Sequence, residues 1–215
     1  GFHPDVDALA ENAIRALKDL GAEIIDEVKI DSIGQFDDSE FDVLSYELKA
    51  DLNAYLTRLP KSAPARTLAE LIEFNRVRAT LEMPFFGQEW FESAQAKGPL
   101  SDPAYRDALA KNHELSRSKG IDAAFSAHRL DALIGPSGGP AWLIDHINGD
   151  HYTGGNTSLA AVAGYPHLTV PMGFVQHLPV GLSFIGLPYS EARLLGLGYA
   201  FEQATRARKS PFRSR

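Results

Sequence analysis

Cysteine is absent from this chain of 215 residues. Its absence excludes disulfide bonds, a thiolate nucleophile and zinc bound by cysteine, and it agrees with a reducing compartment, so we expect a cytoplasmic protein. Long apolar runs are also absent, because no stretch approaches the ~20 consecutive apolar residues of a membrane span. The first residues, GFHPDVDALAENA, lack the basic region and apolar core of a signal peptide. We therefore expect no membrane partner.

Positive charge is scarce and scattered. The formal net charge is -7, so most of the surface would repel a phosphate backbone. Basic residues gather only at the end of the chain, as is typical of a solvated terminus: Arg206, Arg208, Lys209, Arg213 and Arg215. We therefore expect no nucleic-acid partner.

The first 130 residues predict helices, because apolar residues recur there at steps of three and four. Gly21 supplies a left-handed stop for the first helix. Thr67, followed by a glutamate three residues later, is a capping signal for the third. We place Glu47, Lys49 and Asp51 on the solvent side of the second helix. The four predicted helices cover residues 5–20, 41–59, 67–81 and 102–125.

A strand is predicted between the first two helices. Ile24, Val28 and Ile30 alternate with polar residues over residues 22–30, which is the pattern of a half-buried strand.

After residue 130 the pattern changes to short strands with almost no polar residue, as expected where helices cover both faces of a sheet. Ser190 is expected to cap a last helix, and Gly196 and Gly198 would let that helix lie close to the sheet. Asn156 is expected to cap a small-residue helix, SLAAVAG. The predicted strands are DALIGP, LTVPMG and VGLSFIG, at residues 131–136, 168–173 and 180–186.

Ser137 lies in GPSGG after a predicted strand, which matches the Gly-x-Ser-x-Gly pattern of a serine nucleophile. The pattern needs a helix directly after the serine, and the following Gly-Gly-Pro favours a loop instead. In addition, no acidic residue lies between Asp150 and Glu191 to orient a downstream histidine. A loop serine is therefore the preferred interpretation, and a nucleophile is the alternative.

Two Asp-His pairs stand close together, Asp145-His146 and Asp150-His151. Two imidazoles and two carboxylates can bind a divalent metal. The intervening Ile-Asn-Gly is a turn sequence, however, and a polar surface turn explains these residues without a ligand. We therefore expect no metal site.

Four aromatic residues fall within seven positions: Phe85, Phe86, Trp90 and Phe91. Large aromatic side chains usually pack in a core, which is the default interpretation. Beside a proline, a glycine and Gln88 on a broken helix, they would also suit the wall of an apolar substrate funnel.

The order of these segments resembles that of amidase-signature hydrolases. Residues 154–173, GGNTSLAAVAGYPHLTVPMG, combine a small-residue helix, a Gly-Tyr-Pro corner and a buried strand. With DALIGP before them and LPVGLSFI and EARLL after them, they are similar to the closing part of this family. In the first half, YELKADLNAYL, TLAELIEFN and MPFFGQEWFE look like the helical region of bacterial amidases near the peptide amidase group. The resemblance covers nearly all 215 residues.

The resemblance implies an α/β fold, as the C-terminal part of the amidase-signature fold: a mixed β-sheet flanked by helices, with a helical substrate-funnel region. Residues 1–215 would be one portion of such a domain. Residues 1–130 would be mainly helical with one strand, and residues 131–215 would be rich in strands and closed by a helix.

Members of this family cleave amides with a serine nucleophile, a second serine beside a cis peptide bond and a lysine base, without metal or organic cofactor. This chain has no Ser-Ser pair and begins at Gly1 rather than at a methionine. The resemblance places the catalytic residues in a half that would precede Gly1, so no catalytic residue is assigned here. The resemblance implies substrate binding by part of the helical region and by the loop before the Gly-Tyr-Pro corner: Phe85, Phe86, Gln88, Trp90, Trp142, Tyr152, Thr153, Gly154 and Asn156. In amidotransferase-type members an acidic residue stands near the place of Gly154, so glutamine specificity is not expected.

We therefore expect a segment of an amidase-family hydrolase acting on carboxamide C–N bonds, which supplies scaffold and substrate pocket and is inactive alone. Its partners would be a small amide substrate and, through exposed strand edges and apolar surface, the missing N-terminal half or a second copy. Two alternatives remain open: a non-enzymatic domain that binds an apolar ligand or a protein, and a serine hydrolase using Ser137.

Overall fold

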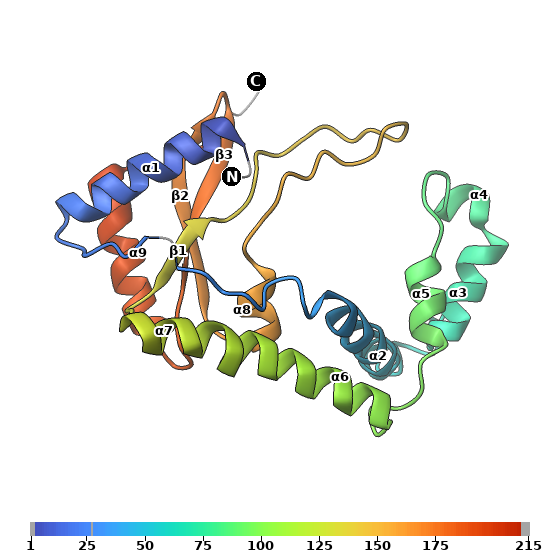
Figure 1. The fold of residues 1–215 in the computed structure, drawn as a ribbon. Helices are drawn as coiled ribbons and strands as arrows, with labels where there is room; N and C mark the ends of the chain where they lie inside the picture. The colour runs from blue at the N-terminus through green and yellow to red at the C-terminus, as the bar shows by residue number, and fades with distance from the viewer. Residues whose placement is uncertain (1–2, 27, 212–215) are drawn as a thin grey trace. The chain divides into compact units, whose positions relative to one another are not determined.

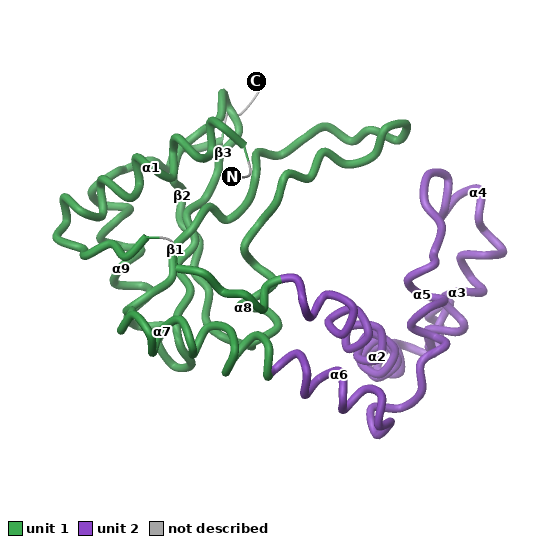
Figure 2. The backbone as a smooth tube through the Cα atoms, viewed as in Figure 1, with its two compact units in different colours: residues 1–33, 114–215 green, residues 34–113 purple. Residues whose placement is uncertain are grey.

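The computed structural model describes residues 3–26 and 28–211. The chain forms two units, residues 1–33 with 114–215 and residues 34–113, each with its own internal packing (Figure 2).

The first unit contains an antiparallel sheet with the strand order β1-β3-β2. Leu182 in the central strand pairs with Pro136 on one side and with Val170 on the other. The mixed sheet expected from the sequence is antiparallel throughout the described residues. For β2 and β3 the reason is local, because they are joined by the two-residue turn Gln176-His177, in which Gln176 has a φ of 54°. The strands are β1 (Leu133–Pro136), β2 (His167–Val175) and β3 (Leu178–Ile185).

Helices α1 (Pro4–Asp19) and α9 (Glu191–Thr205) pack on one face of this sheet (Figure 1). Their buried side chains join Val180, Leu182 and Phe184 in one hydrophobic core. The sequence predicted helices on both faces of the sheet, and this is confirmed for the face that α1 and α9 cover. On the opposite face, polar side chains line part of the sheet around Ser183.

The close approach of α9 depends on Gly198. A Cβ at Gly198 would lie 2.6 Å from Cδ2 of Leu168, whereas a Cβ at Gly196 would meet nothing within 4 Å. The prediction is therefore confirmed for Gly198 and wrong for Gly196, which faces away from the sheet.

The predicted strand over residues 22–30 is wrong, apart from Glu27, which lies outside the described residues. Ile24, Val28 and Ile30 are half-buried as their alternation requires, and Ile24 packs against the core. No neighbouring strand pairs with them in the described part of the chain, and an extended segment without such pairing is not a β-strand. The left-handed stop at Gly21 is confirmed, with a φ of 92°.

The second unit is helical. Thr67 caps α3 as predicted, because its hydroxyl accepts a hydrogen bond from the Glu70 amide at 3.1 Å. The placement of Glu47 and Lys49 on the solvent side is wrong: both are half-buried, because α2 packs its side with these residues against α5 and α6. The helices are α2 (Asp37–Leu56), α3 (Leu68–Val77), α4 (Ala79–Glu82), α5 (Glu89–Gln95) and α6 (Pro103–His113).

The helix predicted from residue 102 is confirmed as three consecutive segments, α6, then η1 (Glu114–Ile121) and α7 (Asp122–His128) of the first unit. Gly120 interrupts the helical backbone with φ -112° and ψ -109°. No helix in residues 3–26 and 28–211 is long and apolar enough to cross a membrane. Arg213 and Arg215 of the basic tail lie outside the described residues.

Two predicted helix caps are wrong. Helix α8 (Ser158–Ala163) begins after Thr157, without a side-chain cap, so Asn156 does not cap it. Ser190 precedes α9, but its hydroxyl donates to the Leu187 carbonyl oxygen at 2.6 Å instead of accepting from the helix. At Ser190 a competing local contact decides the side-chain position.

Candidate functional site

Four polar side chains form a hydrogen-bonded cluster on the sheet face opposite α1 and α9. The Ser137 hydroxyl lies 2.5 Å from the Thr169 hydroxyl and 2.8 Å from that of Ser183. Ser183 is fully buried, and its oxygen lies 2.6 Å from Nε2 of His167. Strand register brings them together, because Thr169 pairs with Ser183 and Ser137 follows β1. We call these four residues the hydroxyl cluster.

Within the described residues, the hydroxyl cluster lacks the geometry of a serine hydrolase site. Burial lowers the pKa of His167, which favours a neutral imidazole able to accept a proton. However, Ser183 stands between His167 and Ser137, and within the described residues no carboxylate orients the imidazole. The Ser137 amide already donates to the Gly181 carbonyl at 2.8 Å, so it is not available to an oxyanion. As expected, β1 leads into a loop rather than a helix.

That loop is a long excursion over residues 138–155, whose two arms meet at an antiparallel bridge between Gly138 and Gly155 (Figure 1). Along the arms, the ring of Trp142 packs edge-on against Tyr152 at a centroid distance of 6.2 Å. Trp142 Nε1 donates to Asp150 at 3.0 Å. A pocket of about 220 Å³ lies at the base, lined in part by Trp142 and Thr153. Four of the predicted binding residues thus lie in one loop: Trp142, Tyr152, Thr153 and Gly154.

The tip of this loop is a turn closed by Asp145. Its carboxylate accepts hydrogen bonds from the amides of Ile147 and Asn148 and from the Asn148 side chain at 2.8 Å. These bonds, first the one from the Asn148 side chain, lower the pKa of Asp145. The polar turn predicted here is therefore confirmed around Asp145. In the part of the chain that the structure describes, no group of three or more His, Asp or Glu side chains is placed to hold a metal ion.

Gly154 and Asn156 lie where the loop returns to the sheet. Gly154 has a φ of 128°, a backbone conformation that residues with a Cβ rarely adopt, and its carbonyl accepts from the Gly139 amide at 3.3 Å. Nδ2 of Asn156 lies 3.1 Å from where a Cβ at Gly135 would stand. The Asn156 side-chain oxygen is buried and accepts no hydrogen bond from any described residue.

The remaining predicted binding residues lie in the second unit, and three of them are exposed aromatic side chains. Phe85, Phe86 and Trp90 are 66%, 72% and 64% exposed, so the default expectation of a core cluster is wrong. The broken helix around Pro84 turns these rings outward. Trp90 packs edge-on against Phe41 from α2 at a centroid distance of 4.7 Å, a contact between two separate helices that no local sequence pattern predicts. We call Phe41, Phe85, Phe86 and Trp90 the aromatic surface.

Gln88 serves as a brace for this surface. Its amide nitrogen donates to the Ile72 carbonyl, and its oxygen accepts from Asn75 Nδ2, both at 3.1 Å. These bonds tie the start of α5 to α3. In the structure, Gln88 therefore links two helices through its side-chain hydrogen bonds.

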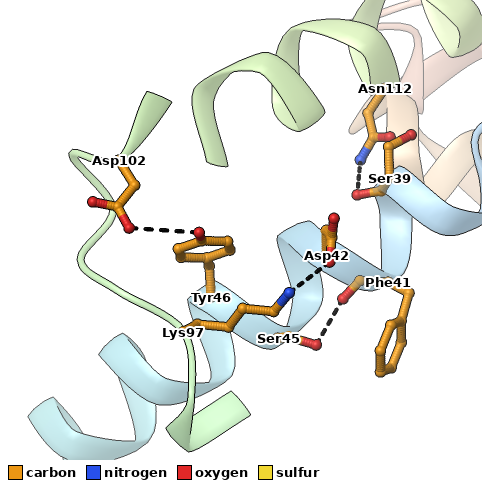
Figure 3. A network of polar contacts seen from close by, with 8 residues as sticks. All are labelled: Ser39, Phe41, Asp42, Ser45, Tyr46, Lys97, Asp102 and Asn112. Atoms are coloured by element: carbon orange, nitrogen blue, oxygen red, sulfur yellow. Dashed lines mark hydrogen bonds and ion pairs between the residues drawn. The ribbon is translucent and has the colours of Figure 1, made fainter. Parts of the chain in front are cut away.

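A polar layer fixes α2 against the rest of this unit (Figure 3). Lys97 forms an ion pair with Asp42 at 2.6 Å, and Tyr46 donates to Asp102 at 3.5 Å. The Ser45 hydroxyl donates to the Phe41 carbonyl at 2.8 Å. Lys49 Nζ also donates to the Gln95 carbonyl at 2.9 Å. Except for the Ser45 bond, which lies within α2, these contacts hold α2 against α5 and the segment that follows it.

Comparison with known proteins identifies the family. A sequence model of the family described as Amidase matches residues 1–195. A probable amidase of Arabidopsis thaliana is 36% identical over 210 residues, covering 95% of this chain and 37% of that protein. A glutamyl-tRNA(Gln) amidotransferase subunit of Listeria welshimeri is 31% identical over 219 residues, covering 95% of this chain and 43% of that protein.

Solved structures agree. The native peptide amidase from Stenotrophomonas maltophilia superposes with a TM-score of 0.87 at 43% identity, covering 96% of this chain and 41% of that one. The peptide amidase PAM in complex with the competitive inhibitor chymostatin gives a TM-score of 0.91 at 43% identity, covering 98% and 42%. The chain thus spans about two fifths of the length of these relatives and structures. From the family match over residues 1–195 and these superpositions, the chain belongs to the amidase-signature family.

Proposed function

We propose that this chain is the C-terminal part of an amidase that hydrolyses carboxamide C–N bonds, and that it binds the substrate rather than carrying out the chemistry. The catalytic serine and its lysine base would lie outside these 215 residues. The hydrolysis would pass through a serine acyl intermediate, as the family resemblance implies. The chain alone is expected to be inactive.

The aromatic surface is the observation that carries this proposal. Three large rings stay mostly exposed although burying each would gain about 1.5–3 kcal/mol. Packing of Trp90 on Phe41 and the hydrogen bonds of Gln88 position the start of α5, and the rings of Phe85, Phe86 and Trp90 stay exposed. A rigid apolar surface of this kind suits the aromatic or aliphatic side chain of a peptide amide. The similarity to peptide amidases supports the same substrate class.

Two edges of the sheet are available for pairing with a partner segment. Strands β1 and β2 are the outer strands, and each has one edge without a paired strand in the described residues. Unpaired strand edges bind further strands. We propose that another part of the amidase occupies them, or a second copy when that part is missing.

Fluorescence of Trp90 tests the binding proposal. The chain has two tryptophans, so Trp142→Phe leaves Trp90 as the only one. Titration of this variant with N-acetylphenylalanine amide should change its emission, and Phe86→Ala should weaken the effect. Tyr199→Ala is the matched control, because Tyr199 is an equally exposed aromatic (66%) on α9 in the other unit. An unchanged emission, or equal effects of both substitutions, would contradict the proposal.

An activity assay tests the proposal that this chain does not catalyse amide hydrolysis on its own. The 215-residue chain should release no ammonia from this amide, while the complete protein should. Turnover by the chain alone that is lost in Ser137→Ala would instead establish the serine hydrolase alternative, and binding without turnover by the complete protein would favour a non-enzymatic domain.

A further inference from the structure

A second polar pocket, of about 410 Å³, lies in the first unit, away from the 138–155 loop. It is formed where η1, the Gly-Tyr-Pro corner and the start of α9 come together. Its lining includes the basic side chain of Arg117, the rings of Tyr165 and Tyr189, and the acidic side chain of Glu191.

Arg117 is held in a fixed orientation in this pocket. Its Nε donates to the Ala163 carbonyl at the end of α8, at 2.8 Å. The guanidinium carbon lies 5.8 Å from the centre of the Tyr165 ring. The Tyr165 hydroxyl in turn donates to Asp122 at 2.9 Å, so that ring is anchored as well. Arg117 is therefore oriented before any ligand arrives, which lowers the entropic cost of binding.

The outer nitrogens of Arg117 remain without acceptors. Neither Nη1 nor Nη2 donates to a group among the described residues, and the ion pairs found there do not include Arg117. Asp122, the nearby carboxylate, is engaged by Tyr165. A guanidinium with two free donors in a plane matches the two oxygens of a carboxylate.

Tyr189 adds an aromatic contact at the rim. It is 95% exposed. Its φ of 62° lies in the left-handed region, which bulky residues rarely adopt. The exposed ring offers an apolar face against which a ligand can pack. Glu191, beside it, offers an acceptor for an N–H group.

We propose that this pocket binds the free C-terminal carboxylate of a peptide or N-acylated amino acid with an aromatic side chain. Arg117 binds the carboxylate, Tyr165 and Tyr189 contact the side chain, and Glu191 accepts from the amide N–H. The inference does not depend on the proposed amidase function, because binding here involves neither the aromatic surface nor catalysis.

A matched pair of probes tests it on the 215-residue chain by NMR titration: N-acetylphenylalanine and its neutral amide. The acid should shift the resonances of residues 163–166 and 188–191, and the amide should bind there about tenfold more weakly or worse, because the charge-assisted hydrogen bonds are lost. Arg117→Gln should weaken binding of the acid by a similar factor. Arg193→Gln should not, because Arg193 pairs with Asp131 outside the pocket.

Equal binding of acid and amide at these resonances, full affinity in Arg117→Gln, or no shift there would overturn the proposal. If Arg117→Gln perturbs the fold through loss of the Ala163 contact, Tyr189→Ala decides instead. Tyr189 is almost fully exposed, so its removal leaves the packing intact and should weaken binding of the acid several-fold. Unchanged affinity in that variant would also overturn the proposal.

Discussion

The two glycines of α9 should respond in opposite directions to the same substitution. Alanine in a helix interior is favoured over glycine by about 1 kcal/mol. At Gly196 a Cβ meets nothing within 4 Å, so Gly196→Ala should raise the free energy of unfolding by about that amount. At Gly198 the Cβ would lie 2.6 Å from Leu168 Cδ2 and 3.3 Å from Val170 Cγ1.

Overpacking of this kind costs about 1–3 kcal/mol, which cancels or exceeds the helix gain. We therefore expect Gly198→Ala to lower stability by about 0–2 kcal/mol, and the two variants to differ by about 1–3 kcal/mol. For a chain of this size, each kcal/mol shifts the melting temperature by about 2–4 °C. Urea unfolding followed by far-UV circular dichroism measures the difference, with an unchanged m-value as the control. Equal stabilisation by both substitutions would refute the packing of α9 on β2 through Gly198.

Three further substitutions test other parts of the fold. Thr67→Ala should destabilise by about 1 kcal/mol in urea unfolding, because it removes the cap of α3, whereas Thr157→Ala, which removes no cap bond, should change stability by less than about 0.5 kcal/mol. Gly181→Ala should destabilise by about 1–3 kcal/mol, because its Cβ would lie 2.5 Å from the Thr169 hydroxyl and 2.8 Å from that of Ser137; a neutral effect would mean that the hydroxyl cluster gives way easily. Burial lowers the pKa of His167, so the unfolded state binds the proton more readily than the folded state. The protein should therefore be most stable above pH 6.5, the ordinary pKa of histidine, and should lose stability as the pH falls below that value. The melting temperature of His167→Gln should fall less than that of the unsubstituted chain over the same pH range.

The sequence was sufficient for elements with strong local signals. The helices around Thr67 and before Gly21, and the strands of the last third, follow from periodicity, caps and apolar runs. The segment from 22 to 30 shows the limit, because alternation of Ile24, Val28 and Ile30 reports burial on one side but not whether another strand lies alongside. Strand pairing is a long-range property that no local pattern contains.

The sequence singled out candidate site residues but could not give their contacts. Phe86 and Trp90 stood out as aromatic residues, yet whether they were core or surface depended on how the chain turns at Pro84. The hydroxyl cluster was missed apart from Ser137, because Thr169 and Ser183 lie 32 and 46 residues away and meet it only through strand register. The expected helix cap by Asn156 failed because the helix begins one residue later.

The hydroxyl cluster has a consequence for where its protons point. A neutral His167 that accepts at Nε2 takes the single proton of Ser183, so Ser137 must give its own to Ser183, and Thr169 must give its own to Ser137. One imidazole thus sets the sense of every hydroxyl in the row. When that ring takes up a proton, Nε2 becomes a donor to Ser183, whose own proton is then free to turn toward Ser137, so Ser137, at the base of the 138–155 loop, is no longer required to be the donor in its hydrogen bond with Ser183.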